Sequence, residues 1–322
     1  MRKLLALILF AILCLVATGI TVFAKTNLLS NSVNSPLPKN LEVLGAKNTP
    51  FLASEDIWLP KDNITKSGPV PTPQVAAASV YMIDLTTDEV LYAKNVHERR
   101  PVASLVKIMT ALVSLERAEK DAKYLVSEKS TSVGEDSMGV TAGERLTYEE
   151  LLYGLMLPSG NDAAETIAEG VGGTHELFVD MMNGKAKQLG LKDSQFVNPT
   201  GLDGDGEHFS SAYDMAVIAR TAYKKYPLFR KVVGTYEYHL PYSDEHKELW
   251  LYNQTSLLTT YPGALGIKPG YTPDAGLCIV TLAENGGHQI LAVLLNGEDR
   301  RAEMIALLDY AFAVQGVTLP AH

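Results

Sequence analysis

Strand-like segments lie at both ends of the folded part of this 322-residue chain, and helical segments lie between them. Residues 79–85 and 89–93 are joined by Thr86-Thr87-Asp88, which predicts a hairpin. The same strand character returns at 235–240, 276–283 and 289–295. Apolar periodicity predicts helices at 148–156, 163–169, 174–189, 212–223 and 302–314. The chain therefore predicts an α/β (α+β) fold with one sheet, completed by segments distant in the sequence, and a helical region inserted between its halves.

The only Ser-x-x-Lys sequence of the chain is Ser104-Leu105-Val106-Lys107. It opens the apolar run 105–115, which predicts a buried helix with Ser104 at its N-terminus. A serine three residues before a lysine places both side chains on one helix face, where the amine can take the hydroxyl proton. Free N–H groups at a helix N-terminus also favour a developing oxyanion. We therefore expect a serine hydrolase with lysine as its base.

Two more short motifs follow in order. They are Ser159-Gly160-Asn161 and Lys268-Pro269-Gly270. Each motif alone is weak, and a turn between two helices, with Asn161 capping the second, explains the first equally well. The ordered set of three motifs is far more specific than any member.

Three segments carry a resemblance to a known family. Residues 101–112 (PVASLVKIMTAL), 155–164 (LMLPSGNDAA) and 198–203 (NPTGLD) resemble the low-molecular-mass penicillin-binding proteins, and among them the D-alanyl-D-alanine carboxypeptidases. The resemblance covers residues 75–315. It implies the β-lactamase/DD-peptidase-like fold, with an antiparallel sheet flanked by helices, an inserted all-helical subdomain, and the site in the cleft between them.

The resemblance implies a role for each residue of the first two motifs. Ser104 is the expected nucleophile, and Lys107 is the expected base, which requires its pKa to fall from about 10.4 to near neutrality. Burial and the like charge of Lys268 would both lower that pKa. Ser159 is expected to relay protons towards the leaving group, and Asn161 to hold the substrate backbone and orient Lys107.

The third motif is expected to hold the substrate. Lys268 would lie on an edge strand whose backbone pairs with an extended peptide, and its ammonium would help to bind the terminal carboxylate. The backbone N–H groups of Tyr271 and Ser104 are expected to form the oxyanion hole.

At one position the chain departs from the family pattern. Where the family commonly has threonine after this lysine, the chain has Pro269, which has no hydroxyl and no N–H. Proline is acceptable on an edge strand. Thr272 is a candidate substitute for the missing hydroxyl, and Arg300 resembles the carboxylate clamp of the family, although Arg300 and Arg301 could equally be solvated charges at a helix start.

Several other classes lack support in the sequence. The net charge of −9 and the lack of a basic cluster disfavour nucleic acid, and neither a Gly-x-Ser-x-Gly elbow nor a Cys-x-x-Cys pair is present. His175-Glu176 lacks the second histidine of a zinc peptidase, and 203–206 (DGDG) lacks the rest of a calcium loop. We therefore predict no metal and no cofactor. Cys278 is expected to be a core residue.

The chain begins with a leader-like segment. Met1-Arg2-Lys3 precedes the apolar run 4–24, and Val22-Phe23-Ala24 would allow cleavage before Lys25. The same run is long enough to remain as a membrane anchor. We therefore expect a signal peptide or anchor at 1–24, a Pro/Asn/Ser-rich linker at 25–74, a catalytic domain at 75–322, and a location on the outer face of the cytoplasmic membrane or in the cell wall.

The expected function is that of a serine D-Ala-D-Ala carboxypeptidase. The resemblance implies removal of the terminal D-alanine from peptidoglycan stem peptides through a Ser104 acyl-enzyme, with β-lactams acylating the same serine. Two alternatives remain open at this point: a D,D-endopeptidase that cuts crosslinks, and a catalytically weak wall-binding protein of the same fold.

Overall fold

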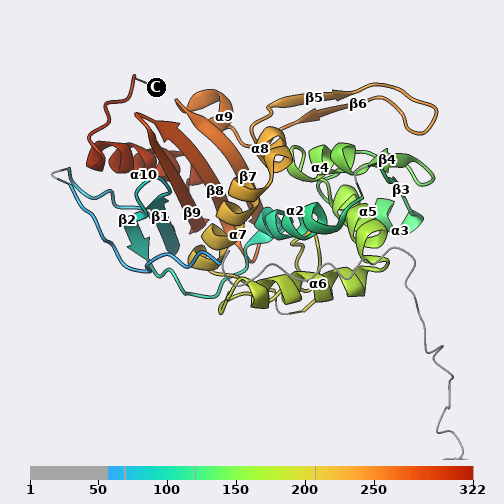
Figure 1. The fold of residues 1–322 in the computed structure, drawn as a ribbon, viewed down its shortest axis with the longest axis horizontal. Helices are drawn as coiled ribbons and strands as arrows, with labels where there is room; N and C mark the ends of the chain where they lie inside the picture. Colours follow the sequence, from blue (N-terminus) through green and yellow to red (C-terminus); the bar gives the residue numbers. More distant parts are fainter. Residues whose placement is uncertain (1–56, 69, 120, 207, 322) are drawn as a thin grey trace, which may run out of the picture. The chain divides into compact units, whose positions relative to one another are not determined.

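A computed structural model describes residues 57–68, 70–119, 121–206 and 208–321 (Figure 1). Its main element is a five-stranded antiparallel sheet in the order β2-β1-β9-β8-β7. Pairing of β1 with β9, for example Ser79 with Leu295, joins the N-terminal and C-terminal strands inside this sheet. The predicted joining of distant segments is therefore confirmed. The strands are β1 (Ser79–Asp84), β2 (Glu89–Lys94), β7 (Ala264–Thr272), β8 (Gly276–Asn285) and β9 (His288–Gly297).

Helices cover both faces of the sheet. Strand β1 shows the consequence, because all six of its residues are buried. Val80 and Met82 pack in the cluster beneath α10 (Arg300–Val314), whereas Tyr81 and Ile83 belong to the larger core on the other face. That second face is covered by α7 (Ala212–Lys225) with α2 (Val106–Arg117) beyond it (Figure 1).

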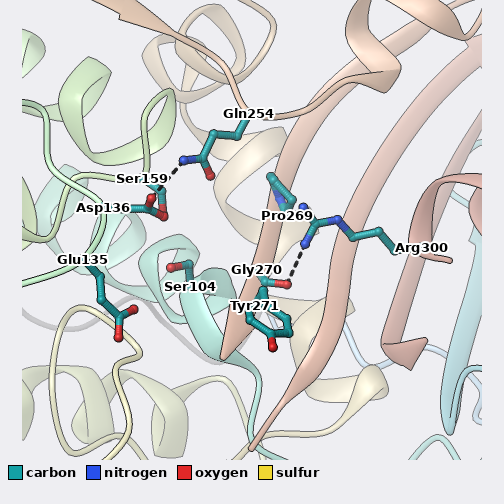
Figure 2. A pocket seen from close by; sticks show the side chains of 9 residues that line it. All are labelled: Ser104, Glu135, Asp136, Ser159, Gln254, Pro269, Gly270, Tyr271 and Arg300. Carbon is teal, nitrogen blue, oxygen red and sulfur yellow. Dashed lines mark hydrogen bonds between the residues drawn. The ribbon is translucent and has the colours of Figure 1, made fainter. Parts of the chain in front are cut away.

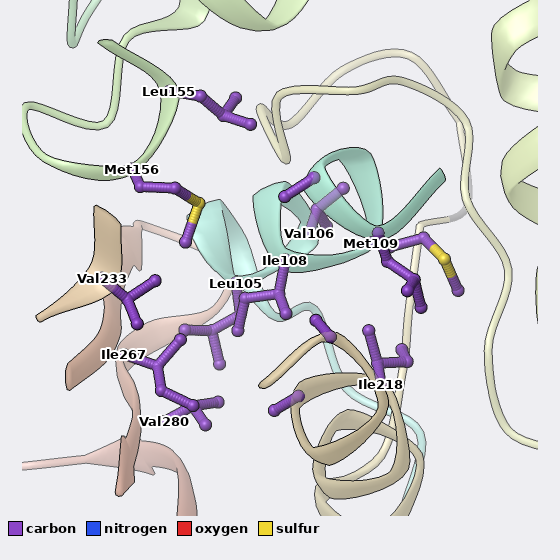
Figure 3. Packing of buried hydrophobic residues seen from close by; sticks show 14 of the residues in the cluster. Leu105, Val106, Ile108, Met109, Leu155, Met156, Ile218, Val233, Ile267 and Val280 are labelled. Atoms are coloured by element: carbon purple, nitrogen blue, oxygen red, sulfur yellow. The ribbon is translucent and has the colours of Figure 1, made fainter. Parts of the chain in front are cut away.

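Helix α2 runs through the centre of the larger core. Its residues 106–114 are all buried, as the apolar run predicts. Leu105 and Ile108 lie among side chains of the sheet and of the surrounding helices (Figure 3). Burial of apolar surface contributes about 25 cal/mol per Å², so the buried side chains of α2 stabilise its position in the core.

The predicted helices are confirmed with shifted ends. Polar caps explain several boundaries: Thr147 forms a capping box before α4 (Tyr148–Met156), and Thr174 and Ser211 cap α6 (His175–Gln188) and α7. These helices are α4 (Tyr148–Met156), α5 (Asn161–Gly172) and α6 (His175–Gln188), with the shorter α3 (Glu128–Thr131), α8 (Pro227–Val233) and α9 (Leu257–Thr260).

The predicted strand at 235–240 exists but does not join the main sheet. It is β5 (Glu237–Leu240), and it pairs with β6 (Leu249–Tyr252) in a separate hairpin. Tyr238 stacks on Tyr153 of α4 at 3.7 Å between ring centroids, which holds the hairpin on the helical region. A further two-stranded sheet, β3 (Lys123–Leu125) with β4 (Arg145–Thr147), was not anticipated.

The described part of the predicted linker lies against the domain. The backbone N–H groups of Thr65 and Lys66 donate to the Val90 carbonyl, and the Arg220 guanidinium lies 4.4 Å from the Trp58 ring centroid. Cys278 is buried, as expected. The predicted leader and the linker up to residue 56 lie outside the described residues. Within the described ranges, no helix is long and apolar enough to cross a membrane.

Candidate active site

Ser104 lies in a short 3₁₀ helix (Ala103–Leu105) that leads directly into α2. Two glycines make room for this turn. A Cβ on Gly270 of β7 would lie 3.0 Å from the Ser104 backbone nitrogen, and one on Gly201 would lie 2.1 Å from the Ala103 carbonyl oxygen. The turn is therefore held between the edge strand and the loop at 198–203, with Ser104 at the helix start as the sequence predicts.

Lys107 is fully buried directly behind Ser104. Its Nζ atom lies 2.9 Å from Ser104 Oγ, 2.7 Å from Asn161 Oδ1 and 2.7 Å from the Thr200 carbonyl oxygen. The last two atoms only accept hydrogen bonds, so they take both N–H groups of a neutral amine. The lone pair of that amine is then left for the Ser104 hydroxyl proton.

Burial lowers the pKa of Lys107 to about 7. The carboxylates of Asp136, Glu135 and Asp162 oppose burial by raising this pKa. At neutral pH a large fraction of the amine is therefore unprotonated, which is the state a general base requires.

Ser159 has an uncommon backbone conformation and lies at the wall of the cavity that Ser104 also lines. Its φ is +66°, and the side chain is fully buried at the cavity wall. Its Oγ has no hydrogen-bond partner among the described residues. Buried hydroxyls normally find a partner, and a positive φ in a non-glycine residue costs about 1–3 kcal/mol. Such an unsatisfied group fits a proton relay that awaits a substrate.

Asn161 begins α5 but does not cap it with its side chain, because Gly160 occupies the cap position. Its Oδ1 accepts from Lys107, while its Nδ2 donates to the Gly134 carbonyl at 2.9 Å. The capping alternative is therefore wrong. The orientation of Lys107, expected from the resemblance, agrees with this geometry.

Lys268 lies on β7, which is an edge strand of the sheet. Its amine is fully buried and contacts the Pro269 carbonyl at 3.2 Å. Burial and then the charge of Lys107 lower the pKa of Lys268 well below its ordinary value. The repulsion between the two amines that the sequence predicts is therefore present, and burial is the largest cause that lowers the pKa of Lys107.

The remaining predicted residues separate into two groups. Tyr271, largely exposed, and Arg300 line the cavity, and Arg300 Nη1 donates to the Gly270 carbonyl at 2.9 Å. Thr272 is buried outside the cavity lining, and its hydroxyl donates to Asp203 Oδ1 at 3.1 Å. The hydroxyl of Thr272 is therefore already engaged, and Arg300 is the better placed of the two for a carboxylate.

The cavity in front of Ser104 has a volume of about 290 Å³ (Figure 2). It is lined by residues from the sheet, from α10, from the Ser104 turn and from three loops. Sequence reasoning missed three of them: Glu135, Asp136 and Gln254. They lie in segments without helical or strand periodicity, and no motif marks them. The nine lining residues are Ser104, Glu135, Asp136, Ser159, Gln254, Pro269, Gly270, Tyr271 and Arg300.

A mixed fold with this serine–lysine pair in a cleft beside an edge strand defines a class of protein, the serine peptidases of the penicillin-binding type. The comparisons with known proteins agree. The sequence model of the D-alanyl-D-alanine carboxypeptidase family matches residues 65–299, and the chain belongs to this family.

Individual relatives support the assignment. The chain is 41% identical over 245 residues to D-alanyl-D-alanine carboxypeptidase DacF of Bacillus subtilis, covering 74% of this chain and 62% of that protein. It is 33% identical to DacB2 of Mycobacterium tuberculosis, covering 80% and 89%. Among solved structures, a DD-transpeptidase of Streptomyces matches with a TM-score of 0.71 at 32% identity, covering 76% of this chain and all of that one. The chain thus spans about three fifths of the length of the Bacillus relative.

Proposed function

We propose that this protein is a serine D-Ala-D-Ala carboxypeptidase acting on peptidoglycan stem peptides. The observation that carries the proposal is the coordination of the Lys107 amine. Two acceptors, Asn161 Oδ1 and the Thr200 carbonyl, satisfy its hydrogens, and the third neighbour is Ser104 Oγ at 2.9 Å. Burial holds the pKa of the amine near 7, so the base is available at neutral pH.

In the first half of the reaction, Ser104 Oγ forms a bond to the carbonyl carbon between the two D-alanines while its proton passes to Lys107 Nζ. The carbonyl oxygen becomes an oxyanion, for which the backbone N–H groups of Ser104 and Tyr271 are the proposed donors. The close approach of β7 to the Ser104 turn supports this pairing. Each such donor lowers the barrier by about 3 kcal/mol.

In the second half, the C–N bond breaks and Ser159 passes its hydroxyl proton to the departing amine of D-alanine. Ser159 Oγ then takes the proton that Lys107 received from Ser104, so that Lys107 becomes neutral again. The unpartnered Oγ of Ser159 at the cavity wall supports this role. Water then attacks the acyl carbon of the ester and gives one proton to Lys107. The bond between this carbon and Ser104 Oγ breaks, and Lys107 passes the proton to Ser104 Oγ. Ser104, Lys107 and Ser159 thus all return to their starting protonation states.

Recognition of the terminal carboxylate falls to the end of the cavity beside Pro269. Because Pro269 offers no hydroxyl, we assign most of this recognition to Arg300, which lines the cavity and can bind a carboxylate with two N–H groups. A carboxylate bound near Lys268 would also provide the counter-charge that favours the ammonium form of Lys268.

The test is acylation of the full-length chain by a labelled penicillin, with wild type beside Ser104→Ala. We expect label on the wild type only, followed by D-alanine release from a Lys-D-Ala-D-Ala peptide. Circular dichroism of both proteins controls for folding. Carboxypeptidase turnover that survives in folded Ser104→Ala would refute the proposal.

The alternatives predict different products. A D,D-endopeptidase would release crosslink fragments, and a weak wall-binding protein would take the label without releasing D-alanine. The Streptomyces relative is named a DD-transpeptidase. An added amine acceptor therefore tests whether an amine, rather than water, takes the acyl group.

We further propose that the protein is exported and works at the outer face of the cytoplasmic membrane or in the cell wall. Support comes from the basic start and apolar run at 1–24. Mass spectrometry of the protein from cells would show whether the leader is removed or retained as an anchor. Accumulation of the full-length protein in the cytoplasm would contradict export.

A further inference from the structure

Glu135 is an exposed carboxylate at the wall of the active-site cavity that the proposed mechanism does not use. Its backbone is in the left-handed region with φ of +64°. Among the described residues, its side chain forms no hydrogen bond or ion pair. A non-glycine residue keeps such a conformation only where the surroundings fix it.

The residue that fixes the backbone on both sides of Glu135 is Asn161, which also contacts Lys107. Asn161 donates from Nδ2 to the Gly134 carbonyl at 2.9 Å and from its backbone N–H to the Asp136 carbonyl at 2.8 Å. Both neighbours of Glu135 are therefore tied to the residue that also orients Lys107. Asp136 is engaged further, because Gln254 Nε2 donates to its Oδ1 at 3.2 Å. Glu135 is left as the free carboxylate of this wall.

The cavity has a direction, which follows from the proposed function. The substrate carboxylate lies near Pro269 and Arg300, and the bond to be cut lies at Ser104. Residues that precede the two D-alanines must then continue along β7 towards Tyr271. In Figure 2, Glu135 and Tyr271 stand on opposite sides of Ser104, away from Gln254 and Ser159 at the other end.

The two sides of the cavity differ in charge. The guanidinium of Arg300 donates to the Gly270 carbonyl on the β7 side of Ser104, and the carboxylate of Glu135 lines the cavity on the opposite side of Ser104 from the exposed ring of Tyr271 (Figure 2). The buried Ser159 hydroxyl at the same cavity wall has no hydrogen-bond partner among the described residues, which fits a group that contacts a ligand. A peptide with a terminal carboxylate and a cation on the residue before D-Ala-D-Ala would match both charges.

We propose that Glu135 selects peptides whose residue immediately before D-Ala-D-Ala carries a positively charged side chain, such as the ammonium of a diamino acid. The inference rests on the proposed carboxypeptidase function and names the substrate class of that site. The aromatic face of Tyr271 can contact the apolar stem of the same side chain, and its ring also attracts cations.

The test compares D-alanine release from two peptides, Nα-acetyl-Lys-D-Ala-D-Ala and its Nε-acetylated form, so that the side-chain ammonium is the only cation. For an exposed ion pair we expect the wild type to favour the charged peptide about five-fold in kcat/KM at low salt. In Glu135→Gln the ratio should approach one. In Glu176→Gln, which removes an exposed carboxylate from a different cavity, the ratio should stay that of the wild type.

The ratio is the right readout because Glu135 also raises the pKa of Lys107, an effect that both peptides share. The preference should weaken as ionic strength rises. Equal turnover of the two peptides by the wild type, an unchanged ratio in Glu135→Gln, or a preference insensitive to salt would each overturn the inference while leaving the carboxypeptidase function intact. Failure to release D-alanine from either peptide, with no penicillin label, would overturn the proposed function and this inference with it.

Discussion

The pKa of about 7 for Lys107 predicts how fast Ser104 is acylated as the pH changes. The base acts only when neutral, so the rate follows the unprotonated fraction of this amine. That fraction is about one half at pH 7 and about one hundredth at pH 5, which predicts a fall of about fifty-fold between these values. Above pH 8 the rate should level off. An ordinary lysine, with a pKa of about 10.4, would instead give a tenfold rise for every pH unit up to pH 9.

The assay is the second-order rate constant for labelling by a fluorescent penicillin between pH 5 and pH 9. Circular dichroism at each pH confirms that the protein stays folded. Glu135→Gln provides an internal check, because removing a carboxylate that raises the pKa of Lys107 should move the midpoint to lower pH. A rate that is flat from pH 5 to pH 9, or that still rises tenfold per unit above pH 8, would refute Lys107 as a base tuned by burial.

Three substitutions test other parts of the site. Ser159→Ala should slow D-alanine release at least about a hundredfold, yet change the free energy of unfolding by less than about 1 kcal/mol, because its Oγ has no partner to lose; a large loss of stability in urea denaturation would contradict this. Gly201→Ala should destabilise the protein by about 3 kcal/mol, since its Cβ would lie 2.1 Å from the Ala103 carbonyl oxygen at a φ of +83°; an unchanged thermal midpoint would contradict that clash. Arg300→Gln should raise KM for the peptide about tenfold or more through loss of a charge-assisted contact, and an unaltered KM would remove Arg300 from carboxylate recognition.

The parts of the site that the sequence predicted depend on local spacing. Ser104 and Lys107 share one helix face whatever the rest of the chain does, so three residues of separation were enough to pair them. The apolar run after Ser104 predicted a buried helix, and its residues 106–114 are indeed buried. The joining of distant strands in one sheet followed from the same kind of pattern, because helices separate the two groups of strands.

The parts that the sequence did not predict depend on tertiary contacts. Glu135 reaches the cavity because Asn161, on another element, fixes both of its neighbours. Gln254 reaches it because it follows β6, a strand that alternation did not reveal. The carboxylates of Asp136 and Glu135, which raise the pKa of Lys107, were not predicted either, since their distance from the amine is a property of the folded chain.

The pairing of β1 with β9 has a consequence for when the enzyme becomes active. Contacts between residues as far apart as Ser79 and Leu295 form slowly, because a long loop must first be closed. Strand β7, which carries Lys268, enters the same sheet through β8 and β9. A chain whose last strands have not yet joined the sheet therefore contains Ser104 but lacks the side of the active-site cavity that β7 forms. If the proposed function holds, reaction with penicillin should therefore report complete folding as well as chemistry.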